Sequence, residues 1–199
     1  MRALARRLGW AGGIALLLAA LALVDRAGLL GRPQRSDRQR YDGKTFRVVH
    51  VVDGDTLDID CPDGSRPKTR VRLLGVDTPE TVKPDAPVQH FGPEATTFVR
   101  RQVLGKLVTI ALPVPRTRDR YGRLVGYVIL PDGRNLSELI IAEGYGYADP
   151  RFAHPLSRQF WRDQRQAIKH RRGLWRDVRE DDLPGYLRGK VKLPTRPER

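Results

Sequence analysis

Cysteine and histidine are scarce in this sequence, and acidic residues are outnumbered by basic ones. Cysteine occurs once in 199 residues, at Cys61, which excludes an intramolecular disulfide and a metal cluster held by cysteines. The four histidines are scattered, and none has the spacing of a zinc-binding pair such as HExxH. A disulfide framework and a zinc site are therefore not expected.

The excess of basic over acidic residues makes the chain strongly basic. There are 37 Lys and Arg but only 23 Asp and Glu, so the formal net charge is +14 and the pI is about 10.7. Such a charge favours a polyanionic partner, either nucleic acid or an anionic membrane surface. An organism that uses arginine freely would give the same charge without that partner. The length suits one ordinary domain with extensions.

Residues 1–25 have the pattern of an export signal. A basic start is followed by the uncharged run 8–24, and a basic region before an apolar region is typical of such signals. The run is near the lower limit of a membrane-spanning helix, roughly 17–25 residues. We expect a signal anchor that stays attached to the membrane, with a cleaved signal peptide as the alternative. In both cases the remaining chain is expected outside the cytoplasm. It would be anchored to the membrane if the signal stays attached, and secreted or periplasmic if the signal is cleaved.

The chain after the signal divides into three parts. Residues 26–43 are polar, basic and without periodicity, which predicts a linker. Residues 44–176 contain the apolar periodic segments and are predicted to form the folded domain. Residues 177–199 mix charges and prolines, and we expect a basic flexible tail.

The periodic segments alternate in a definite order. Two β-rich runs share 45–59 and meet at an Asp-Gly turn, and a third strand runs to Val76. A helix over 92–105 follows, with Pro93 in its first turn. Two more strands follow, at 106–114 and 123–130, and two helices, at 135–144 and 155–175, complete the order. The prediction is an α+β fold, mainly β: a five-stranded closed barrel of the OB type with three helices.

Two aspartates follow strands of this predicted barrel. Asp55 comes just after the first tight turn, and Asp77 ends the third strand. If the second and third strands pair, both carboxylates can meet at one end of the barrel. Two carboxylates with a backbone carbonyl and water suit Ca²⁺, and Mg²⁺ also prefers oxygen ligands. The alternative is that both residues only shape turns.

Three further residues have side chains suited to phosphodiester chemistry. Glu80 lies three residues after Asp77 and could activate or orient a water molecule. Arg72 and Arg123 could bind phosphate oxygens through their guanidinium groups. A solvent-exposed glutamate and ordinary surface arginines are the alternatives for each of them taken alone.

Four blocks of sequence together point to a known family. VVDGDT, RLLGVDTPE, GPEA and DRYGR occur in this order, and over about 44–175 the chain closely resembles the staphylococcal nuclease (thermonuclease) family. The resemblance implies an OB-fold barrel with three helices. It also implies a Ca²⁺-dependent phosphodiesterase that cleaves DNA and RNA and leaves a 3′-phosphate and a 5′-hydroxyl.

The resemblance assigns roles to individual residues. It implies that Ca²⁺ is held by Asp55, Asp77 and the carbonyl of Thr78, with Asp53 as a nearby acid. Glu80 matches the glutamate that acts on water, and Arg72 and Arg123 match the phosphate-binding arginines. The remaining matches, expected beside the nucleotide phosphate, are Arg120 and Tyr121.

Two features depart from the family pattern. The loop after Glu80 reads TVKPDAPVQHF where the best-known member is rich in lysine. The family's nucleotide-stacking tyrosine has no clear counterpart among Tyr145, Tyr147 and Phe152. Two other functions stay open: an inactive OB-fold module that binds nucleic acid, and a protein of the membrane surface. The sequence indicates no protein partner, and we expect a monomer.

Overall fold

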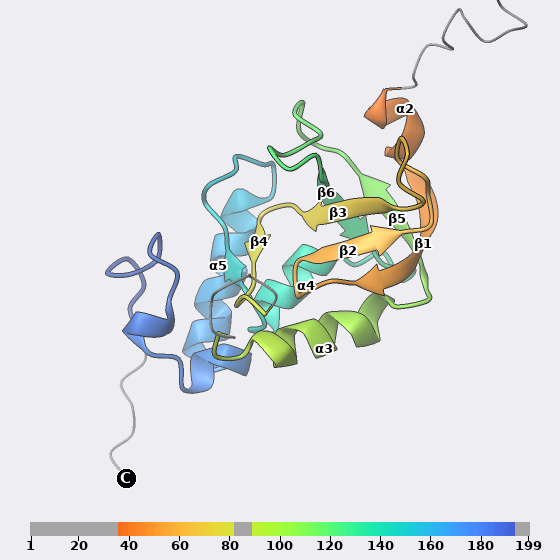
Figure 1. Ribbon diagram of the computed structural model, residues 1–199. Helices are drawn as coiled ribbons and strands as arrows, with labels where there is room; N and C mark the ends of the chain where they lie inside the picture. The colour runs from red at the N-terminus through yellow and green to blue at the C-terminus, as the bar shows by residue number, and fades with distance from the viewer. Residues whose placement is uncertain (1–35, 82–88, 194–199) are drawn as a thin grey trace, which may run out of the picture. The chain divides into compact units, whose positions relative to one another are not determined.

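A computed structural model describes residues 36–81 and 89–193 (Figure 1). The predicted signal segment lies outside the described residues, as does most of the loop after Glu80. In the described ranges, no helix is long and apolar enough to cross a membrane. The compact unit that begins at Asp37 contains the barrel and its helices.

Five strands form a closed barrel in the order β1-β2-β3-β6-β5 (Figure 1). Neighbouring strands are antiparallel, except that β3 and β6 are parallel. The predicted five-stranded barrel is thereby confirmed. Its strands are β1 (Lys44–Val51), β2 (Thr56–Ile59), β3 (Thr69–Leu73), β5 (Leu107–Ala111) and β6 (Leu124–Ile129).

The three predicted helices are present, as α3 (Gly92–Val103), α4 (Leu136–Ala142) and α5 (Ser157–Lys169). A proline occupies the first turn of α3. The Asn135 side chain caps α4 by accepting a hydrogen bond from the backbone N–H of Ser137 at 2.9 Å. Such a cap satisfies a backbone donor that the first helical turn would otherwise leave unpaired.

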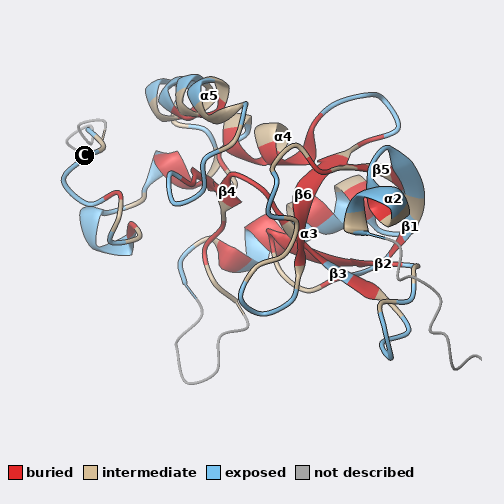
Figure 2. Ribbon diagram, turned by 90° about the horizontal axis from the view of Figure 1, so that it is seen from above, coloured by how far each residue is buried: buried red, intermediate tan, exposed pale blue. Residues whose placement is uncertain are grey.

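Two apolar clusters hold these elements together. The larger fills the barrel and the space under the helices, and each buried Leu, Ile, Val or Phe side chain there contributes about 1.5–3 kcal/mol. Figure 2 shows this burial along the barrel strands and the exposed outer face of α5. The smaller cluster lies beyond the barrel and consists of Tyr147, Ala167, Leu174, Trp175, Leu183 and Leu187.

The predicted linker 26–43 differs from the structure at its end. A short helix, α2 (Asp37–Tyr41), precedes β1. Tyr41 is fully buried, and its hydroxyl lies 2.9 Å from the Thr69 hydroxyl. Asp37 forms an ion pair with Arg118 at 2.7 Å. The folded part therefore begins at Asp37 rather than Lys44, because one aromatic side chain in a polar run finds a place in the core.

The predicted flexible tail also differs from the structure. Two short 3₁₀ helices, η1 (Gly173–Arg176) and η2 (Glu180–Asp182), follow α5. After them, Leu183 and Leu187 are buried in the smaller cluster with Trp175. Residues 177–193 thus pack on the domain through apolar contacts.

The third predicted strand breaks before its expected end. The chain turns at Gly75, whose φ of +77° is in the left-handed region. A Cβ there would lie 2.4 Å from the His154 ring, so no other residue fits without displacement. After the turn, β4 (Val76–Asp77) leaves the barrel and pairs with β7 (Tyr147–Ala148). This break brings Asp77 to the mouth of the barrel.

Candidate active site

A cavity of about 980 Å³ opens at this end of the barrel. It is lined by all of the site residues predicted from the sequence, which come from the β1–β2 turn, β3, β4 and the segment after it, and the loop between β5 and β6. Their roles stay predictions, but the structure brings them together. They are Asp53, Asp55, Arg72, Asp77, Thr78, Glu80, Arg120, Tyr121 and Arg123.

Asp55 is fixed by local and distant donors. Its own backbone N–H donates to the Asp53 carboxylate at 3.0 Å, which closes the turn. Its Oδ2 accepts hydrogen bonds from the backbone N–H and the hydroxyl of Thr78, at 3.1 and 3.3 Å. The approach depends on Gly54, because a Cβ there would lie 2.7 Å from the Thr78 hydroxyl. The β1–β2 turn is therefore held against the segment that follows β4.

Arg72 joins the two predicted metal-binding aspartates. Its Nη1 lies 2.9 Å from Asp55 Oδ1, and its Nη2 lies 2.9 Å from Asp77 Oδ1. Its side chain is only 11% exposed, beside carboxylates that are 10% and 22% exposed. Nη1 also donates to the Val76 carbonyl at 2.8 Å. One guanidinium thus fixes the separation of the two acids.

Arg72 does not fully neutralise the acids around it. Burial and the nearby charge of Asp55 raise the pKa of Asp53 to about 7. Burial, followed by Asp55, also raises the pKa of Asp77, and the opposing effects of Arg72 and Arg151 are smaller. Burial and a neighbouring carboxylate therefore disfavour the charged forms of Asp53 and Asp77 more than Arg72 favours them.

The oxygen atoms at this end of the barrel suit a divalent cation. Asp55 and Asp77 offer carboxylate oxygens and Thr78 offers a carbonyl, the hard ligands that Ca²⁺ and Mg²⁺ bind. Within residues 36–81 and 89–193, no group of three or more His, Cys, Asp or Glu side chains forms a metal site. A cation here would be held by two carboxylates, one carbonyl and water.

Arg123 approaches the cavity from the start of β6. Its Nε donates to Asp119 at 2.7 Å, and its Nη1 donates to Thr56 at 3.4 Å. Among the described residues its side-chain hydrogen bonds use Nε and Nη1, which leaves Nη2 for a substrate oxygen. The guanidinium groups of Arg120 and Arg123 lie 4.8 and 5.4 Å from the Tyr121 ring centre. Tyr121 itself is 61% exposed, so its ring can contact substrate.

Glu80 lies shortly after Asp77 and Thr78, the predicted metal ligands. Its carboxylate accepts a hydrogen bond from the Thr81 backbone N–H at 3.1 Å. Its own backbone N–H donates to the Gln89 side chain at 2.8 Å. These bonds hold the carboxylate at the cavity wall, on the side of Asp77 and Thr78.

The structure adds three residues that the sequence did not assign to the site. Arg151 and the exposed Phe152 line the cavity, and Arg151 Nη2 lies 2.9 Å from Asp77 Oδ2. Tyr186 donates its hydroxyl to the same Oδ2 at 2.9 Å. Burial raises the pKa of Tyr186, so this hydroxyl stays protonated and remains a donor. The spacing of Leu183 and Leu187 was the one sequence signal for a packed segment there.

Comparison with known proteins identifies the family. A family model described as staphylococcal nuclease homologue matches residues 70–177. A thermonuclease of Staphylococcus hyicus is 37% identical over 136 residues, which cover 66% of this chain and 76% of that protein. This chain belongs to the staphylococcal nuclease family.

Two endonucleases are also similar to this chain. An uncharacterized endonuclease of Escherichia coli is 33% identical over 142 residues, which cover 71% of this chain and 82% of the relative. Endonuclease YncB of Bacillus subtilis is 33% identical over 114 residues, or 57% of this chain and 51% of the relative. The range matched by the staphylococcal nuclease model contains Arg72, Asp77, Glu80 and Arg123. It ends before the segment that supplies Tyr186.

Proposed function

We propose that this member of the staphylococcal nuclease family is a Ca²⁺-dependent nuclease that hydrolyses both DNA and RNA. The chain is a hydrolase of phosphodiester bonds, as its family and its nuclease relatives indicate. The observation that carries the proposal is the cavity in which Arg72 bridges Asp55 and Asp77 beside Glu80 and Arg123.

The metal would be held by Asp55, Asp77 and the Thr78 carbonyl. When bound, Ca²⁺ would neutralise charge on a phosphodiester oxygen. The assignment is supported by the type of ligand atoms and by the position of Asp55 and Asp77 on either side of Arg72. A dication beside these carboxylates would favour their charged forms.

The side chains around the proposed metal site would each have a separate role in hydrolysis. Glu80 orients or deprotonates the attacking water from the cavity wall. Arg72 and Arg123 donate to the phosphate oxygens, most strongly when charge builds on them in the transition state. Arg120 and Tyr121 bind the nucleotide beside the phosphate. Asp53 holds the turn that presents Asp55.

Activity on both DNA and RNA follows from what these groups contact. Arg72, Arg123 and the cation bind phosphate, which the two polymers share, and phosphate contacts carry no direct sequence information. Discrimination between DNA and RNA requires contacts to the 2′-hydroxyl. The net charge of +14 adds a salt-dependent attraction that ignores sequence.

The location and assembly proposed from the sequence agree with this chemistry. We propose that residues 1–25 direct the domain out of the cytoplasm, either as a membrane anchor or as a cleaved signal. Extracellular sites bind Ca²⁺ with dissociation constants of roughly 10⁻⁴–10⁻³ M, so a weak open site would suffice there. We also propose that the enzyme acts as a monomer.

The experiment is a cleavage assay with the purified chain. Plasmid DNA and RNA are incubated with Ca²⁺, Mg²⁺ or a chelator. We expect cleavage of both in Ca²⁺ and none with the chelator. Glu80→Gln should lower kcat by roughly 10²–10⁴-fold, as for loss of a general base, with little change in binding. Full activity in the chelator would refute the metal assignment. Binding of both polymers without cleavage in any metal would instead favour the inactive module.

A further inference from the structure

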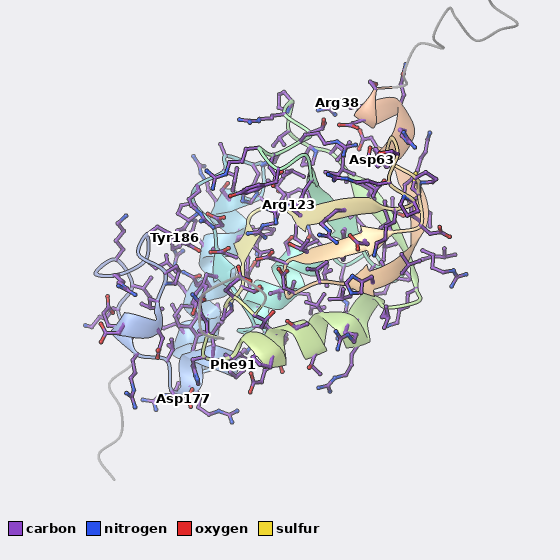
Figure 3. The ribbon with its side chains drawn as sticks, viewed as in Figure 1. Arg38, Asp63, Phe91, Arg123, Asp177 and Tyr186 are labelled. Carbon is purple, nitrogen blue, oxygen red and sulfur yellow. The ribbon has the colours of Figure 1, made fainter. Side chains whose placement is uncertain are left out.

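The segment that follows the family match places a side chain on the candidate metal site. Leu183 and Leu187 are buried in the smaller cluster with Trp175. Between them, Tyr186 points its hydroxyl at Asp77 and donates to Oδ2 at 2.9 Å. In Figure 3, Tyr186 and Arg123 are labelled to either side of β4. A residue 109 positions along the chain from Asp77 thus contacts its carboxylate.

The Tyr186 ring is itself held in place. The Arg151 guanidinium lies 4.6 Å from the ring centre, an attractive cation–π arrangement. Arg151 also contacts Asp77 Oδ2 at 2.9 Å and Asp149 Oδ1 at 2.8 Å, and the Asp149 side chain is 1% exposed. A buried carboxylate therefore anchors Arg151, and Arg151 anchors the ring.

These contacts leave Asp77 little freedom to rotate. Arg72 holds Oδ1, while Tyr186 and Arg151 hold Oδ2. Asp77 lies on the two-residue strand β4, outside the barrel, so the barrel hydrogen bonds do not fix its side chain. Outer partners of this kind orient the carboxylates that bind metals, and their loss typically costs 10–100-fold in metal affinity or activity.

We propose that Tyr186 is a positioning residue, which orients the Asp77 carboxylate for the divalent cation. This inference rests on the proposed Ca²⁺-dependent function. Under this proposal residues 177–187 are part of the active enzyme, because the burial of Leu183 and Leu187 places the Tyr186 hydroxyl beside Asp77.

The arrangement favours positioning over obstruction of the site. Asp77 and Arg151 line the cavity, and Tyr186 is not among the described residues that line it. The hydroxyl therefore reaches Asp77 from outside the cavity, and the space for substrate stays open. An inhibitory segment would fill that space.

The test compares Tyr186→Phe with Tyr145→Phe in the full chain. Tyr186→Phe removes only the hydroxyl and keeps the ring under Arg151. Tyr145 is a matched control because its ring stacks on Phe98 at 4.0 Å, and its hydroxyl has no hydrogen bond among the described residues. Calcium titration by calorimetry measures metal affinity directly, and cleavage of DNA at saturating Ca²⁺ gives kcat and KM.

We expect Tyr186→Phe to weaken Ca²⁺ binding about tenfold, the low end of the range for outer partners. Its KM for DNA at saturating Ca²⁺ should stay within about twofold of wild type, because the cavity is unchanged. Tyr145→Phe should bind Ca²⁺ as wild type does. Thermal unfolding without metal should show both variants folded, so that the loss is assigned to the site.

Each contrary result has a distinct meaning. If the wild type depends on Ca²⁺ and Tyr186→Phe binds Ca²⁺ with unchanged affinity, the positioning role is refuted and the proposed function stays intact. A higher kcat or a lower KM in Tyr186→Phe would also refute it, in favour of an inhibitory segment. A wild-type chain that cleaves DNA without binding Ca²⁺ would refute the metal assignment and this inference together.

Discussion

Arg72 offers the sharpest test of how the site is held together. It lies between Asp55 and Asp77, makes ion pairs of 2.9 Å with both, and is 11% exposed. Arg72→Met keeps most of the aliphatic stem, which packs like the original, and removes the charge. The variant therefore leaves the two buried acids facing each other with their main counter-charge gone.

The expected loss of stability follows from this burial. Removing one partner of a buried ion pair typically costs 3–5 kcal/mol, because the other charge stays buried. Asp77 is 22% exposed and keeps its contacts to Arg151 and Tyr186, so we expect about 3 kcal/mol, the low end. At roughly 2–4 °C per kcal/mol for a domain of this size, the unfolding midpoint should fall by about 6–12 °C.

Urea unfolding at pH 7 in a chelator, followed by tryptophan fluorescence, measures this loss. The matched control is Arg134→Met, whose ion pair with Asp132 is exposed on both sides and should show no measurable loss. Added Ca²⁺ should stabilise Arg72→Met more than wild type, since a dication neutralises the same carboxylates. If Arg72→Met loses no more stability than Arg134→Met, the bridge does not hold the site.

Two other residues give independent tests. Burial alone would raise the pKa of Asp58, but Arg70 and Lys68 outweigh it and lower the pKa to about 2. Stability from a lowered pKa is present above the unfolded value near 4 and is lost as pH falls towards 2. Asp58→Asn should therefore lower the free energy of unfolding by about 1–2 kcal/mol at pH 7, a value reduced because its basic partners are exposed. Urea unfolding at pH 3 should show a smaller difference between the variant and wild type. A difference that does not change with pH would contradict this linkage. Phe152→Ala should raise KM for DNA about tenfold with little change in kcat, because base stacking contributes roughly 1–3 kcal/mol. The control is Leu104→Ala, since Leu104 is exposed and is not among the described residues that line the cavity. A similar rise of KM in this control would argue against a specific contact of Phe152.

The site could be predicted from the sequence because its parts lie at strand ends. Asp55 follows a tight turn, and Arg72 and Asp77 belong to neighbouring segments of one predicted strand. Pairing of β2 with β3, in which Thr56 lies opposite Arg72, brings them together once the barrel closes. The break at Gly75 was not predicted, since glycine in a strand is also compatible with a straight run. It nevertheless decides where Asp77 lies.

The remaining parts depend on contacts that no local pattern specifies. Arg151 lies in a loop after β7, and the pairing of β7 with β4 brings it close to Asp77, with which it forms an ion pair. The last segment was predicted to be flexible because charges and prolines dominate its composition. Leu183 and Leu187 are buried where it docks, because Trp175 provides an apolar surface that the sequence alone does not reveal.

The position of Tyr186 in the chain bears on how the site is completed. All five barrel strands and both aspartates are synthesised before residue 130, whereas Tyr186, which donates to Asp77 Oδ2, comes much later. A chain cut at the exposed residue Gly185 would keep all five barrel strands yet lose that hydroxyl. If Tyr186 positions Asp77 as proposed, a chain with a folded barrel would reach its full affinity for Ca²⁺ only after residues 183–187 have docked.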